Sequence, residues 1–124
     1  MTNTPSAHIR TGKLGEDIAT EFLIQHDVEI IGRNLRTDFG EIDILGKDDG
    51  VMLFVEVKTR RTQKFGFPET AVNARKKKHM TNSAWAYLQK IGALDHAWRI
   101  DVISIYLRKN IPPEIEWFKN AITS

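Results

Sequence analysis

A chain of 124 residues, of which 41% are hydrophobic and 27% charged, is typical of one soluble globular domain and argues against extensive disorder. The absence of cysteine excludes disulfides and thiolate metal sites, and no apolar run approaches the ~20 residues that span a bilayer. The net charge of +2 alone indicates no particular partner. We therefore expect a single domain over residues 1–124, located in the cytoplasm and away from membranes.

The hydrophobic pattern predicts a series of regular elements after a flexible segment over residues 1–11. The expected elements are a helix over residues 13–26, a strand over 28–31, hairpin strands over 41–45 and 51–59, a helix over 73–91 and a strand over 98–106. Between the first two strands, residues 33–36 are expected to form a basic link. This α-β-β-β-α-β order predicts an α/β fold with one mixed sheet flanked by helices.

The flanks of the second helix and the end of the chain contain turn signals. Asn73 is a suitable N-cap for that helix, and Gly92 is a suitable end. Pro112 and Pro113 predict a turn, because proline has no backbone N–H for a sheet ladder. Residues 115–118 are then expected to form either a short strand or an irregular tail.

Two charged residues lie inside the apolar run over residues 51–58. Side chains alternate between the faces of a strand, so Glu56 and Lys58 share one face with Phe54 and lie about 6.5–7 Å apart. An ordinary ion pair on an exposed strand would explain these two charges alone. The apolar residues around them favour a functional site, because charges in a buried segment need compensation.

Asp43 on the preceding strand joins this pair only if the hairpin turn has the right length. An even connection, such as residues 47–50 or 48–49, places Asp43 opposite Phe54 and diagonal to Glu56. An odd connection turns Asp43 to the other face of the sheet. We expect the even connection, with Asp43 and Glu56 within reach of one cation.

The residue types at this site indicate a chemistry. Two carboxylates on a buried face repel each other, and a divalent cation would relieve the repulsion. Ligands that offer only oxygen favour Mg²⁺ or Mn²⁺. Such an ion can activate water and stabilise charge on a phosphoryl group, and Lys58 beside it would stabilise the same charge. Asp43, Glu56 and Lys58 therefore predict metal-dependent cleavage of a phosphodiester.

Basic residues cluster around the expected site and would attract a polyanion such as DNA. Most of them follow the second hairpin strand or begin the second helix. The candidates are Arg36, Arg60, Arg61, Lys64, Arg75, Lys76, Lys77 and Lys78. For the run over residues 75–78, a solvated helix face is an equally simple explanation.

Several motifs together resemble a known family. An acid on one strand, followed after a turn by Glu-x-Lys, resembles the PD-(D/E)xK signature of restriction-endonuclease-like nucleases. The wider sequence from about residue 12 to 107 resembles the YraN-like family of small predicted endonucleases, which are similar to archaeal Holliday-junction resolvases. The motifs are Gly15-Glu16, Arg33-Asn34-Leu35-Arg36, Gly40-Glu41-Ile42-Asp43, the segment over residues 54–60 and the segment over residues 65–72. The resemblance implies a restriction-endonuclease-like fold.

The resemblance also implies roles for individual residues. Asp43, Glu56 and Glu16 would hold the metal, and Lys58 would be the catalytic lysine. The chain has no Pro-Asp pair before the hairpin turn, which departs from the family pattern. Glu41 lies on the same face as Asp43 and is a second candidate for the first acid. We favour Asp43, because apolar residues flank it on both sides, and expect Glu41 to pair with an arginine.

The leading hypothesis is a Mg²⁺- or Mn²⁺-dependent endonuclease that acts on DNA, on a branched or structured form by analogy with resolvases. Junction cutting usually needs two active sites, so a symmetric homodimer would suit such a substrate. The alternative hypothesis is a nucleic-acid-binding module or partner subunit that keeps the nuclease scaffold without turnover. Its binding would need no metal and would weaken steeply with salt.

Overall fold

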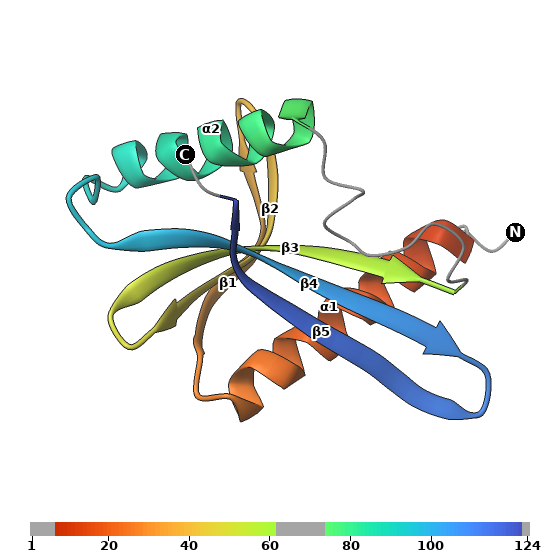
Figure 1. Cartoon of the computed structure of the whole chain (residues 1–124). Helices are drawn as coiled ribbons and strands as arrows, with labels where there is room; N and C mark the ends of the chain where they lie inside the picture. The colour runs from red at the N-terminus through yellow and green to blue at the C-terminus, as the bar shows by residue number, and fades with distance from the viewer. Residues whose placement is uncertain (1–6, 62–73, 123–124) are drawn as a thin grey trace, which may run out of the picture.

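The computed structural model describes residues 7–61 and 74–122 (Figure 1). The elements within them are α1 (Ala7–Gln25), β1 (Glu29–Thr37), β2 (Gly40–Asp48), β3 (Val51–Arg60), α2 (Ala74–Lys90), β4 (Trp98–Arg108) and β5 (Ile111–Ile122). The strands form one sheet in the order β1-β2-β3-β4-β5, in which β3 and β4 run parallel and the other neighbours antiparallel. This mixed sheet with flanking helices confirms the predicted α/β class and is consistent with a restriction-endonuclease-like fold.

The two helices cover opposite faces of the sheet (Figure 1). Successive side chains of β3 alternate between them: Leu53 and Val55 pack on the side of α1, whereas Met52 and Phe54 pack on the side of α2. β3 is therefore buried from both sides, which explains its continuous apolar run. Neither described helix is long and apolar enough to cross a lipid bilayer.

α1 begins earlier than the sequence pattern predicts. The helix includes residues 7–12, which precede the expected start at residue 13, while residues 1–6 lie outside the described part of the chain. A contact outside the helix holds its first turns in place: the Arg61 Nε donates a hydrogen bond of 3.0 Å to Thr11 Oγ1. The end of β3 therefore supports the beginning of α1, and local periodicity alone does not show this.

β1 is longer than predicted, because residues 33–36 continue the strand instead of forming a link. The half-buried Leu35 alternates with exposed neighbours, as expected of an edge strand with one covered face. A register shift between Ile30 and Gly32 interrupts the pairing with β2, and the pairing then resumes as far as Thr37. Such a bulge bends a strand without ending it.

β5 forms one edge of the sheet, contrary to the turn predicted at Pro112 and Pro113. The chain reverses instead at residues 109–110, where Asn110 has a φ of 62°, and β5 then pairs with β4. An edge strand tolerates proline, because one side of its backbone needs no partner strand. The final strand therefore covers much more than the expected residues 115–118.

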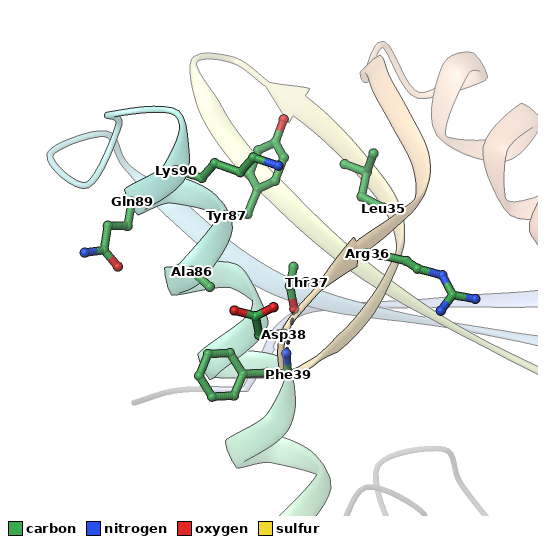
Figure 2. A pocket seen from close by; sticks show the side chains of 9 residues that line it. All are labelled: Leu35, Arg36, Thr37, Asp38, Phe39, Ala86, Tyr87, Gln89 and Lys90. Atoms are coloured by element: carbon green, nitrogen blue, oxygen red, sulfur yellow. Dashed lines mark hydrogen bonds between the residues drawn. The ribbon is translucent and has the colours of Figure 1, made fainter.

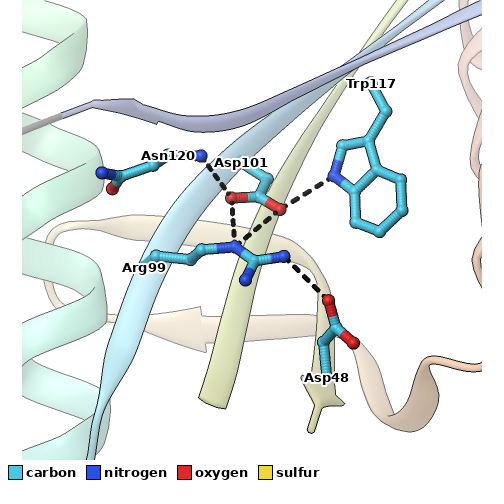
Figure 3. Close-up of polar contacts among 5 residues, drawn as sticks. All are labelled: Asp48, Arg99, Asp101, Trp117 and Asn120. Carbon is cyan, nitrogen blue, oxygen red and sulfur yellow. Dashed lines mark hydrogen bonds and ion pairs between the residues drawn. The ribbon is translucent and has the colours of Figure 1, made fainter.

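A buried carboxylate joins β4 and β5 to the β2–β3 turn (Figure 3). Asp101 is fully buried and accepts hydrogen bonds from Arg99 Nε at 3.0 Å, Trp117 Nε1 at 2.8 Å and the Asn120 backbone N–H at 2.8 Å. Arg99 also donates to Asp48 at 3.0 Å. Because donors surround both carboxylate oxygens, this buried charge is well compensated and has a structural role.

Gly15 allows α1 to approach β3 closely. A methyl group at this position would overlap Thr59 Oγ1 on β3 and lie 2.8 Å from Thr59 Cβ, closer than van der Waals contact permits. Glycine is unfavourable inside a helix by about 1 kcal/mol, so tertiary packing explains its presence here. The next residue, Glu16, is consequently held against the sheet.

We expect Gly15→Ala to destabilise the protein, because the added methyl group forces α1 away from Thr59. Overpacking of this kind costs about 1–3 kcal/mol of unfolding free energy, measured by urea denaturation. Gly12→Ala is the matched control in the same helix, because nothing lies within 4 Å of a methyl group there. That variant should be neutral or more stable by up to about 1 kcal/mol. Equal effects of the two substitutions would contradict the close approach of α1.

Candidate metal centre

The β2–β3 hairpin has an even turn, but its register differs from the expected one. Asp48 pairs with Val51 across the two-residue connection of Asp49 and Gly50, whose φ values are 49° and 84°. Two positive φ values are typical of a type I′ turn, which Asp-Gly favours. The pairing runs as far as Ile44 with Val55, so the next residues along are Asp43 and Glu56. Asp43 therefore lies beside Glu56 itself rather than opposite Phe54.

β2 and β3 separate at Asp43. β2 continues to pair with β1 as far as Gly40, whereas its pairing with β3 ends at Ile44. In place of a further ladder bond, the Val57 backbone N–H donates a hydrogen bond of 2.9 Å to Asp43 Oδ2. Ile42 packs with the core on the α2 side, whereas Ile44, two residues further along β2, packs on the α1 side. Strict alternation therefore does not describe this end of β2.

Three carboxylates meet at this separation. Oxygens of Glu16, Glu41 and Asp43 all lie within 4.8 Å of one another. Glu16 comes from α1 and the other two from β2, so the cluster joins a helix to the sheet. The sequence predicts an arginine partner for Glu41, and Arg36 does lie opposite it in the β1–β2 pairing. The structure nevertheless brings the Glu41 carboxylate to the other two acids.

The environment of the cluster disfavours negative charge. Burial, and then the charge of Glu56, raise the pKa of Asp43 to about 7, against the opposing effect of the Val57 N–H. Burial also raises the pKa of Glu16, although hydrogen bonds from Asn34 and the charge of Arg33 lower it. A cation bound between these acids would counteract both shifts, because its positive charge stabilises the ionised carboxylates. Without metal, Asp43 releases its proton only as the pH approaches about 7.

Glu56 is buried beside Asp43 and contacts two lysines. Its Oε1 lies 3.3 Å from Lys58 Nζ on the same strand and 3.0 Å from Lys76 Nζ on α2. A side-chain hydrogen bond also links Glu56 to Asp43. The pairing of Glu56 with Lys58 agrees with their predicted position on one face. Lys76, which the sequence places among DNA-binding residues, lies against the site acid instead.

The four acids form a suitable site for a hard divalent cation. Their donors are all carboxylate oxygens, the ligand type that Mg²⁺ and Mn²⁺ prefer. A hollow of about 20 Å³ beside Glu41 and Glu56 is lined mostly by apolar side chains and does not touch Glu16 or Asp43, so it is separate from the grouped oxygens. Among the described residues, the spatial grouping of Glu16, Glu41 and Asp43 is therefore the best candidate cation site, with Glu56 next to it.

The remaining basic candidates lie around this site with different degrees of exposure. Arg75, Lys77 and Lys78 are exposed at the start of α2. Arg61 is exposed but donates to Thr11, and Arg60 is half-buried and has an interaction partner. Arg36 is exposed on β1, and Lys64 lies outside the described residues.

A separate groove of about 740 Å³ lies between the tip of the β1–β2 hairpin and α2 (Figure 2). Residues 35–39 form one wall, and Tyr87, Gln89 and Lys90 contribute to the other. The Thr37 hydroxyl hydrogen-bonds the Ser83 hydroxyl at 3.1 Å, which ties the hairpin to the helix. None of the four acids lines this groove, so it is a neighbouring surface and not part of the metal centre.

Residues 15–105 match the uncharacterised protein family UPF0102, a span of most of the chain that begins beside Glu16. The chain belongs to the UPF0102 family. This result confirms the YraN-like resemblance as a family assignment. The matched span of this UPF0102 protein includes all four acids of the centre and both lysines that contact Glu56.

Curated relatives match over most of their length. The chain is 40% identical to a UPF0102 protein of Caldicellulosiruptor saccharolyticus over 111 residues, which cover 89% of this chain and 94% of that protein. It is 42% identical to a UPF0102 protein of Geobacter sulfurreducens over 110 residues, with 89% and 86% coverage. A UPF0102 protein of Symbiobacterium thermophilum is 43% identical over 96 residues, with 77% and 81% coverage.

The raised pKa of Asp43 predicts that its contribution to the stability of metal-free protein falls as pH rises. Between the ordinary pKa of 3.8 and the folded value of about 7, the folded protein retains a proton that the unfolded chain releases. The contribution of Asp43 to stability is therefore fully present below about pH 4 and declines toward pH 7, by at most about 1.4 kcal/mol per pH unit.

Urea denaturation in EDTA from pH 4 to 7.5 measures this decline. Asp43→Asn keeps the shape of the side chain and should remove this part of the pH dependence. Asp95→Asn, at an exposed position outside the site, should keep it. Adding Mg²⁺ should flatten the profiles of the wild type and Asp95→Asn but leave that of Asp43→Asn unchanged. Identical profiles for the wild type and Asp43→Asn in EDTA would contradict the buried environment assigned to Asp43.

Proposed function

We propose that this UPF0102 protein is a metal-dependent endonuclease that hydrolyses phosphodiester bonds in DNA. The observation that supports this most strongly is the convergence of Glu16, Glu41, Asp43 and Glu56, in which burial and neighbouring acids raise the pKa of Asp43 to about 7. Structural carboxylates are normally compensated by hydrogen-bond donors, as Asp101 is. Asp43 has one backbone donor and acidic neighbours instead, and this imbalance favours a site for a cation.

A bound Mg²⁺ or Mn²⁺ would supply positive charge at the phosphodiester and make water a better nucleophile. Glu16, Glu41 and Asp43 would hold the ion, since their oxygens already lie together. Glu56 would complete the set of acids from β3. This assignment keeps the three acids that the family resemblance implies and adds Glu41.

Lys58 would act on the substrate itself. Its ammonium is 3.3 Å from Glu56 Oε1, so it lies at the border of the acidic cluster and not inside it. A lysine in that position can stabilise the negative charge that develops on a phosphoryl group or orient the attacking water. Lys58 also limits the net negative charge of the site before substrate binds.

DNA would approach over the start of α2 and the end of β3. Arg75, Lys77 and Lys78 are exposed there and would contact backbone phosphates without reading bases. Within residues 7–61 and 74–122 no base-reading element is evident, which favours recognition of DNA shape, such as a branch. Two copies in a symmetric dimer would present two such sites to a four-way junction.

A second candidate function is DNA binding without turnover. The exposed cations at the start of α2 would serve it equally well, and such binding would need no metal. The two functions differ in their dependence on the acids. Hydrolysis requires the acids and a cation, whereas binding through phosphates does not.

Incubation of purified protein with labelled linear, flapped and four-way DNA, with Mg²⁺, Mn²⁺ or EDTA, tests the proposal. We expect cleavage with either cation and none in EDTA. Glu56→Gln and Lys58→Ala should each lower the cleavage rate about 100-fold or more, because each removes a group that acts on the reacting phosphate or its metal.

Glu21→Gln is the matched control, since this glutamate is exposed on α1 five residues from Glu16. It should cut at the wild-type rate, whereas Glu16→Gln should not. If the wild type cuts none of these substrates with either cation, yet binds them in EDTA as tightly as Glu56→Gln and Lys58→Ala do, binding without turnover is the better assignment.

A further inference from the structure

Lys76 is directed toward the sheet, unlike the two lysines that follow it in sequence. It lies in the first turn of α2, and its Nζ is 3.0 Å from Glu56 Oε1. Lys77 and Lys78, next to it in sequence, are exposed. The same carboxylate oxygen of Glu56 also contacts Lys58 at 3.3 Å. Two ammonium groups therefore converge on one buried acid from different elements.

The register of α2 explains why Lys76 is the inward lysine. Residues four apart on a helix lie on one face, and Lys76 is followed at this spacing by Met80 and Ala84. Met80 packs against the core on this side of the sheet, and Ala84 is fully buried. The packing of α2 on the sheet thus directs residue 76 toward β3 and turns residues 77 and 78 outward.

Lys76 can also reach the surface. Its side chain is 40% exposed, compared with 28% for Lys58 and 10% for Glu56. A lysine has a flexible four-carbon stem and a compact charge, so its ammonium can change partners over several ångströms. The exposed cations beside it are those expected to contact DNA phosphates. Of the two lysines on Glu56, Lys76 is the one placed between the acid and the DNA-binding surface.

We propose that Lys76 is a positioning residue that exchanges partners when substrate binds. In protein without metal or DNA, it neutralises Glu56 and so competes with a divalent cation for that carboxylate. When a DNA phosphate takes up the Lys76 ammonium, Glu56 becomes available to the cation. DNA and cation then strengthen each other's binding through this residue, and the coupling is reciprocal. This inference rests on the proposed function.

The affinity for Mn²⁺, measured from the electron paramagnetic resonance signal of free Mn²⁺, tests the first half of the proposal. Without DNA, Lys76→Gln should bind Mn²⁺ about threefold or more tightly than the wild type, because a partly exposed competing ion pair is removed. Lys77→Gln removes the same charge one residue away and should stay within about twofold of the wild type. Lys76→Arg keeps the charge and should resemble the wild type.

DNA affinity, measured by fluorescence anisotropy on a duplex with hydrolysis-resistant phosphorothioate linkages, tests the second half. Lys77→Gln should weaken DNA binding by the same factor in EDTA and in Mn²⁺. Lys76→Gln should weaken it more in Mn²⁺ than in EDTA, since only the cation frees its ammonium for a phosphate. Thermal unfolding of each variant checks that it is folded, and Lys76→Arg serves for comparison if Lys76→Gln is not.

The outcomes separate this inference from the proposed function. If Lys76→Gln and Lys77→Gln change Mn²⁺ affinity equally while Glu16→Gln abolishes Mn²⁺ binding, Lys76 has no special part and the metal centre stands. If the wild type and Glu16→Gln bind Mn²⁺ alike, the metal centre is absent and both proposals fail. The exchange of partners is supported if Lys76→Gln binds Mn²⁺ more tightly than the wild type does, while Lys77→Gln and Lys76→Arg do not.

Discussion

The hydrogen bond from the Val57 backbone N–H to the Asp43 carboxylate is the constraint on which the candidate centre depends. It forms where β2 and β3 separate, so a side chain replaces the backbone ladder and is held between the strands. Glu16 reaches the same place because Gly15 lets α1 lie directly against β3. Glu41 reaches it because β2 continues along β1 after leaving β3. One interruption of the sheet therefore gathers carboxylates from a helix and two strands.

A fully buried aspartate, Asp101, and a half-buried one, Asp43, illustrate how structure and function place opposite demands on a carboxylate. Asp101 accepts hydrogen bonds from Arg99, Trp117 and the Asn120 backbone, and it joins strands without further help. Asp43 has one backbone donor and acidic neighbours, and its pKa is raised to about 7. Hydrogen-bond donors around a buried acid indicate a structural role. Acidic neighbours indicate that the acid binds a cation from outside the chain. The same contrast explains why Asp43 contributes less to the stability of metal-free protein near neutral pH than under acidic conditions.

Local periodicity predicts much of this architecture, and long-range packing decides the rest. Apolar spacing and turn residues identify both helices, the hairpin and the shared face of Glu56 and Lys58. The even Asp49-Gly50 turn brings Asp43 to Glu56, but the register is two residues away from the expected one. The length of β1 and the edge position of Pro112 depend on pairing partners that are distant in sequence. Spacing within α2 places Lys76 on the same face as Met80 and Ala84, but its approach to Glu56 also depends on where α2 packs against the sheet.

The central claim is that the acids around Asp43 form one cation site. Crystals soaked in MnCl₂ and examined by anomalous scattering at a wavelength that excites manganese test it most directly. We expect an anomalous peak within coordination distance, about 2–2.5 Å, of oxygens from Glu16 and Asp43, with Glu41 or Glu56 as a further ligand. The peak should be absent from Asp43→Asn crystals treated in the same way. Manganese bound only elsewhere on the surface, or a peak that persists in Asp43→Asn, would contradict the assignment.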